Sequence, residues 1–231
     1  MKCGGVIMQS LNRDKNPGLN RTALDKIKQQ SLTEKCTELK EKLSKRQPET
    51  IARLAGLALE PAANDTLWLI GNYLLETCRI SWPNLQIICS NSKPVSLGLE
   101  ALWLHYLERA DGEALTRRWV NLSEIGGLFY QQAFQGYSGD ELAAYWQDDL
   151  EGFKKTCLSE GGWPVQGLGD LAFEWRVLPR LPLCICYRLT DSENGAWATI
   201  LFDSSASHYV AADVAATVGK ELSDRLTGTK R

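Results

Sequence analysis

Apolar positions recur along the chain with two periods, which predict both helices and strands. Spacings of three and four residues predict helices over residues 22–44, 49–57, 95–110, 138–157 and 214–226. Alternating or continuous apolar runs predict strands over residues 66–70, 73–82, 85–89, 171–177, 183–189 and 196–202. The last three strands are separated only by turn residues, which predicts a C-terminal β-meander. The predicted fold class is α+β, a mostly antiparallel sheet with that meander and with helices packed on one side.

Two short motifs suggest where elements begin or turn. Gly71-Asn72 lies between apolar runs and predicts a two-residue hairpin turn. A helix remains the alternative for Tyr73–Cys78, because its leucines suit either element. Ser138-x-x-Glu141 matches a capping box, which predicts one helix that starts there and closes at Gly161-Gly162.

The pattern divides the chain into three parts. Residues 1–21 are polar and predict a flexible N-terminus. Residues 22–58 form a helical N-terminal extension whose thin apolar stripe predicts packing on the domain surface. Residues 59–231 are expected to form a single α+β domain.

Charge and composition exclude several classes of protein. The formal net charge is −2, with 26 basic and 28 acidic residues, and no basic stripe suggests a nucleic-acid partner. No apolar run approaches the roughly 18 residues of a membrane span, so we expect neither a membrane association nor a location outside the cytoplasm. The seven cysteines contain no Cys-x-x-Cys pair and are expected to be reduced there.

The richest candidate site follows the last predicted strand. Asp203 and His208 lie within six residues of each other and are candidate metal ligands or ligand-orienting groups. Nearby polar or rigidly placed side chains that would contact a bound cofactor are Ser205, Ser207, Tyr209, Arg180 and Asp170. The alternative is structural: an Asx or serine turn that leads the chain toward the last helix.

Other chemical patterns are weaker. Ser207 and His208 are adjacent and would point to opposite faces of an extended chain, which argues against a serine hydrolase. Cys184 and Cys186 share one strand face, where burial as small apolar residues is favoured over binding of a soft metal. His105 on its helix is expected to be half-buried and hydrogen-bonded.

Several stretches together resemble the prokaryotic domain-of-unknown-function family 3786 over about residues 23–226. They are Leu104-His-Tyr-Leu107, Trp119, Gly127–Tyr130 with Phe134, Gly169-Asp170, Leu178–Pro182 and Leu201–Tyr209. The resemblance implies a metal-binding or cofactor-binding protein of anaerobic bacteria and archaea. Longer relatives carry a cysteine-rich iron–sulfur segment, whereas the N-terminal region here holds only Cys3 and Cys36. Cluster chemistry would therefore need an iron–sulfur or cofactor-carrying partner protein.

Three functions follow as hypotheses. The first is a cytoplasmic metal- or cofactor-binding accessory protein of anaerobic metabolism. The second is a small-molecule enzyme in which Asp203 holds His208 as the general acid or base. The third is a protein–protein adaptor that uses the charged N-terminal helix and exposed tryptophans.

Overall fold

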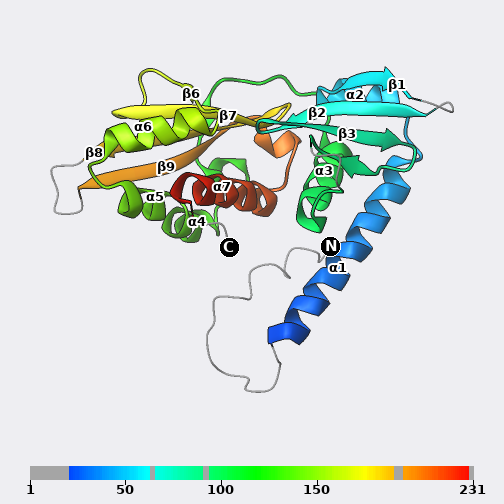
Figure 1. Ribbon diagram of the computed structural model, residues 1–231, viewed down its shortest axis with the longest axis horizontal. Helices are drawn as coiled ribbons and strands as arrows, with labels where there is room; N and C mark the ends of the chain where they lie inside the picture. The colour runs from blue at the N-terminus through cyan, green and yellow to red at the C-terminus, as the bar shows by residue number, and fades with distance from the viewer. Residues whose placement is uncertain (1–20, 63–65, 91–93, 190–194, 229–231) are drawn as a thin grey trace.

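The computed structural model describes residues 21–62, 66–90, 94–189 and 195–228. Two antiparallel sheets lie end to end along the long axis of the molecule, and helices line one side of the larger sheet (Figure 1). The predicted α+β class is confirmed, with two sheets in place of one. The predicted flexible N-terminus, residues 1–21, lies outside the described residues apart from Arg21. No helix in the described part of the chain combines the length and apolar character that a membrane span requires.

The N-terminal half builds the smaller sheet and three helices. Its elements are α1 (Arg21–Leu43), α2 (Pro48–Ala55), β1 (Ala58–Pro61), β2 (Leu67–Tyr73), β3 (Glu76–Trp82), β4 (Ile87–Ile88) and α3 (Leu97–Arg109). The strands pair in the order β1-β2-β3-β4. The C-terminal half of α1 lies against α3, where Cys36, Leu39 and Leu43 are buried, and its first turns extend away from both sheets (Figure 1).

The hairpin between β2 and β3 turns three residues later than the sequence predicts. Gly71 and Asn72 are paired strand residues, opposite Cys78 and Thr77, and the turn falls at Leu74 and Leu75. The prediction of a turn at Gly71-Asn72 is therefore wrong, as is the helical alternative. A Cβ atom on Gly71 would lie 2.3 Å from the Leu57 side chain and 3.1 Å from Trp103. Glycine is required here for close packing rather than for a turn.

The prediction of reduced cysteines is wrong for one pair. Cys78 in β3 and Cys89, just after β4, form a disulfide. The register that pairs Arg79 with Ile88 brings these two cysteines opposite each other. The strand register decides which cysteines lie close enough to form a disulfide, and the register cannot be predicted from the spacing of cysteines along the sequence.

The C-terminal half builds the larger sheet. Its elements are β5 (Trp119–Val120), the short 3-10 helix η2 (Leu122–Ile125), α4 (Gln131–Tyr137), α5 (Gly139–Trp146), α6 (Leu150–Ser159), β6 (Trp163–Pro164), β7 (Leu171–Leu178), β8 (Leu181–Leu189), β9 (Ala196–Asp203), η3 (Ala206–His208) and α7 (Ala212–Thr227). The strand order is β5-β9-β8-β7-β6, and every described pair is antiparallel. The predicted C-terminal meander is confirmed.

Helices cover one face of the larger sheet. Phe153 of α6 packs its ring against Phe173 of β7 and Tyr187 of β8, and the Tyr187 hydroxyl donates to the Gln147 carbonyl at the end of α5. Because side chains alternate along a strand, the neighbours of these residues point away from the helices. We call that side the outer face; its side chains include Trp163, Glu174, Arg176, Cys184, Arg188 and Trp197.

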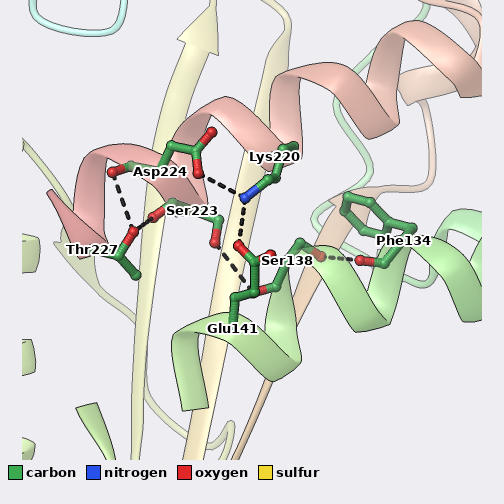
Figure 2. Close-up of polar contacts among 7 residues, drawn as sticks. All are labelled: Phe134, Ser138, Glu141, Lys220, Ser223, Asp224 and Thr227. Carbon is green, nitrogen blue, oxygen red and sulfur yellow. Dashed lines mark hydrogen bonds and ion pairs between the residues drawn. The ribbon is translucent and has the colours of Figure 1, made fainter. Parts of the chain in front are cut away.

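The single helix predicted over residues 138–157 is two helices. Gln147 has a φ of 47°, and the Asp149 carboxylate accepts a hydrogen bond of 2.8 Å from the Gly152 amide to start α6. The predicted capping box is also absent at Ser138, whose hydroxyl donates to the Phe134 carbonyl at 2.5 Å (Figure 2). The carboxylate of Glu141 pairs instead with Lys220 of α7. Tertiary contacts with α7 thus replace the local cap.

Candidate functional site

The stretch Asp203–Tyr209 runs from the end of β9 toward α7. It is hydrogen-bonded to an irregular segment, residues 110–118, which we call the strap. The Asp203 side chain is fully buried. Its Oδ1 accepts hydrogen bonds from the amide and hydroxyl of Thr116 (3.1 and 2.9 Å) and of Ser205 (3.0 and 2.7 Å). Its Oδ2 accepts one of 2.7 Å from the Arg117 amide. One buried carboxylate therefore holds both its own turn and the strap.

These hydrogen bonds stabilise the ionised carboxylate. Burial raises the pKa of Asp203, but the hydrogen bonds from Ser205 and Thr116 lower it more, so the pKa lies below its ordinary value. Four of the five donors converge on Oδ1 and one reaches Oδ2, so both carboxylate oxygens already have hydrogen-bond partners. The structural alternative, a turn leading to the last helix, describes the geometry observed here.

A resident metal ion does not fit this donor set. A cation on Asp203 would face the N–H and O–H groups that already point at both oxygens. Among the described residues, no three His, Cys, Asp or Glu side chains gather in a way that could hold an ion. Metal binding through Asp203 and His208 stays a prediction, and this hydrogen-bonding pattern argues against it.

His208 contacts a different carboxylate from the one expected. Its Nδ1 lies 2.7 Å from Oδ2 of Asp111, at the start of the strap, and 41% of the His208 side chain is exposed. The hydrogen bond from His208 lowers the pKa of Asp111. The five hydrogen bonds that Asp203 accepts come from Thr116, Arg117 and Ser205, so the expected Asp203–His208 pair does not form.

Tyr209 and Arg180 both donate hydrogen bonds to backbone carbonyls of the strap. The Tyr209 hydroxyl donates to the Glu113 carbonyl, and the ring stacks on Tyr106 at a centroid distance of 5.8 Å. The Arg180 guanidinium donates to the carbonyls of Gly112 and Glu113 at 3.2 Å each. Burial raises the pKa of Tyr209, so the phenol remains a donor at neutral pH. Both residues therefore serve the backbone of the strap.

Helix α3 holds the other side of the same stretch. The Arg109 guanidinium donates to the Ser207 carbonyl at 2.8 Å, so Ser207 takes part through its backbone. His105 accepts a hydrogen bond of 3.1 Å from the Ala211 amide at Nε2. Burial lowers the pKa of His105, which favours the neutral ring that this contact needs. The prediction of a half-buried, hydrogen-bonded histidine is confirmed.

Asp170 does not join this group. Its carboxylate accepts a hydrogen bond of 2.7 Å from the Leu189 amide at one end of β8, whereas Arg180 precedes the other end. Asp111, Thr116 and Arg117 were not among the predicted site residues, although they contact His208 and Asp203. The strap lacks periodicity, so its sequence carries no pattern that would have revealed these contacts.

The outer face of the larger sheet presents large side chains to solvent. Trp163 on β6 is 75% exposed and Trp197 on β9 is 42% exposed. Arg117 of the strap bridges to Glu174, the cross-strand partner of Trp163, with contacts of 3.0 and 2.9 Å. Cys184, which lies in the same row as Glu174, is buried, and burial raises the pKa of its thiol to about 12. This fits the predicted role of a small apolar residue.

Comparison with known proteins gives one match. The family model described as "Domain of unknown function (DUF3786)" matches residues 47–225. No curated protein and no solved structure matches the chain.

Proposed function

Because the chain belongs to the DUF3786 family, whose description assigns no activity, we propose its function from geometry: an accessory protein that binds another protein through its outer face. The observation that carries this proposal is the exposure of Trp163 on the side of the larger sheet opposite the helices. Asp203, His208 and Tyr209 bind groups of the protein itself, whereas this indole has most of its surface in water.

Exposed tryptophan favours association because its burial removes a large apolar area from water. Tryptophan and arginine are also the residue types that dominate binding energy at protein interfaces. Trp197 and Arg188 are cross-strand partners on this same face, which adds one residue of each type to Trp163. The face therefore has the composition of an interface rather than that of an ordinary solvated sheet.

The family resemblance suggests which protein is bound. An iron–sulfur or cofactor-carrying partner in anaerobic metabolism would supply the metal ligands that the described residues of this chain do not bring together. In this proposal the chain acts as an adaptor or chaperone for that partner. Cofactor chemistry would then belong to the partner's residues.

A second candidate rests on the 2.7 Å contact between His208 Nδ1 and Asp111 Oδ2. A carboxylate on one ring nitrogen orients the imidazole, so that Nε2 can take or give a proton. If the chain is an enzyme, Asp111 takes the orienting role that the sequence analysis gave to Asp203. A pH–rate profile that loses one limb in both His208→Gln and Asp111→Asn would support this candidate.

Site-specific crosslinking in cells tests the adaptor. A photoreactive phenylalanine analogue replaces Trp163, and the control carries it at exposed Arg53 on the smaller-sheet side. We expect one adduct of defined mass at position 163 and none at position 53. Adducts at position 53 alone, or none at either site, would overturn the proposal.

Purified components then give the quantitative test. The crosslinked protein, once identified, should bind the Trp163→Ala/Trp197→Ala variant at least about tenfold more weakly than the parent chain. Phe129→Ala is the matched control, because Phe129 is 92% exposed but lies outside the larger sheet. An equal loss of affinity in the control would show nonspecific hydrophobic association rather than binding through the outer face.

A further inference from the structure

We infer that His105 makes the contact between the two halves of the molecule sensitive to mild acid, because the hydrogen bond that its ring accepts at the start of α7 requires a neutral imidazole. His105 lies on α3, and its Nε2 accepts a hydrogen bond of 3.1 Å from the amide of Ala211, the N-cap residue of α7. The Arg109 guanidinium of α3 donates to the Ser207 carbonyl just before this point. Helix α3 belongs to the N-terminal half and α7 to the C-terminal half, so both contacts join the halves.

The direction of this hydrogen bond fixes the protonation state of the ring. An amide N–H can donate only to a ring nitrogen that carries a lone pair, so the single ring proton of His105 lies on Nδ1. Protonation replaces the lone pair on Nε2 with a second N–H group, because both nitrogens of a charged imidazole are donors. Two donors then face each other across the contact between α3 and α7. The Ala211 amide loses its acceptor, and no rotation of the charged ring restores one.

The start of α7 adds a second reason for the ring to stay neutral. The Ala211 side chain cannot provide the capping hydrogen bond that serine, threonine or aspartate would supply. Unpaired amides give the N-terminal end of a helix a partial positive charge, so an imidazolium beside it is repelled. Asp213 in the first turn reduces this repulsion, and its carboxylate also accepts a hydrogen bond of 2.9 Å from the Val214 amide. Protonation of His105 is therefore opposed at the same point where the hydrogen bond is lost.

Charged groups from three helices act on the ring. Glu108 and Arg109 lie on α3, Lys35 on α1 and Asp213 on α7. Burial lowers the pKa of His105 most, Arg109 and Lys35 also lower this pKa, and the two carboxylates raise it. The folded pKa therefore lies below the ordinary value of 6.5. The stabilisation that this contact adds is complete above pH 6.5 and is lost as the pH falls from that value through the folded pKa.

The chain contains two histidines, and acid changes their contacts in opposite ways. A proton on His208 converts its 2.7 Å contact with the Asp111 carboxylate into an ion pair. A proton on His105 instead removes the hydrogen bond from Ala211. The guanidinium of Arg109 stays charged throughout, so its contact does not change with pH. Mild acid should therefore loosen the start of α7 from α3 while the strap keeps its contact with His208.

Nuclear magnetic resonance of the isotope-labelled full chain, from about pH 7.5 to about pH 5, tests this acid sensitivity directly. We expect the His105 ring to titrate with a midpoint below pH 6.5, and the Ala211 amide resonance to shift with the same midpoint. Hydrogen exchange of that amide, corrected for the intrinsic pH dependence of exchange, should become at least about fivefold faster at the acid end.

Two variants assign the response to one histidine. His105→Gln should remove the pH response of the Ala211 amide, because a carboxamide oxygen accepts a hydrogen bond and does not titrate in this range. His208→Gln is the matched control and should retain the response. A response that persists in His105→Gln or disappears in His208→Gln would overturn the inference. In the parent chain, where no variant has to fold, a His105 midpoint at or above pH 6.5 or an Ala211 amide that does not respond would also overturn it.

Discussion

The contact between the strap and residues Arg180 and Asp203–Tyr209, which we call the junction, and the outer face use similar residue types in opposite ways. At the junction, Arg180 and Tyr209 donate to backbone carbonyls of the strap, and Asp203 accepts five hydrogen bonds. On the outer face, Arg176 and Trp163 are exposed. Charged and aromatic side chains can therefore stabilise the fold as readily as they can bind a partner. Which role they have depends on whether the protein itself supplies their partners.

The largest expected effect is at Asp203. Asp203→Ala leaves the Thr116, Arg117 and Ser205 donors without an acceptor in a buried site. We expect the free energy of unfolding to fall by about 3–5 kcal/mol in urea denaturation. A loss below about 1 kcal/mol would mean that the strap is not held by this carboxylate. The control Asp170→Ala, which removes a single amide contact near the sheet end, should cost far less.

Acid should weaken the contacts that Asp203 makes with the strap. The pKa of Asp203 is lower in the folded chain than its ordinary value of 3.8, so folding favours the ionised form. The resulting stabilisation is complete well above pH 3.8 and is lost as the pH falls through that value toward the folded pKa. Unfolding measured from pH 6 to pH 3 should therefore show a steeper loss for the parent chain than for Asp203→Asn. Parallel curves would contradict this account.

Tyr209→Phe should have a moderate effect. The substitution keeps the ring stacked on Tyr106 and removes only the hydroxyl that donates to the Glu113 carbonyl. One net hydrogen bond in a buried site contributes about 1 kcal/mol, and the orphaned carbonyl adds to this, so we expect a loss of about 1–2 kcal/mol. The control is Tyr145→Phe, whose side chain is 57% exposed. Equal melting curves for the two variants would place Tyr209 outside the junction.

The smallest expected effect is at the outer face. Arg176→Ala and Arg188→Ala remove exposed side chains that have no ion-pair partner among the described residues. Their free energies of unfolding should stay within about 0.5 kcal/mol of the parent chain. A loss above about 2 kcal/mol in either would erase the contrast between the two regions, because it would show that this face is also part of the architecture.

Much of the fold could be predicted, because amphipathic periods follow directly from which side of an element is buried. Residues 171–177, 183–189 and 196–202 were recognised as a meander, and the structure extends each by only a residue or two at the ends. The predictions of a turn at Gly71-Asn72 and of a helix cap at Ser138 were wrong for the same reason. Tertiary contacts, with Trp103 at Gly71 and with α7 at Ser138, outweighed the local preference.

The candidate site shows where local patterns stop being informative. The composition of the chain was enough to mark Asp203, His208, Tyr209 and Arg180 as unusual, and the structure brings these four to the strap. Their partners in the strap lie 67 to 97 residues away in the sequence. Hydrogen-bond donors pair with acceptors that the fold places nearby. An aperiodic segment has no sequence pattern from which these partners could be predicted. The sequence by itself thus identifies the candidate residues, whereas the packing of distant segments determines what each of them contacts and therefore its role.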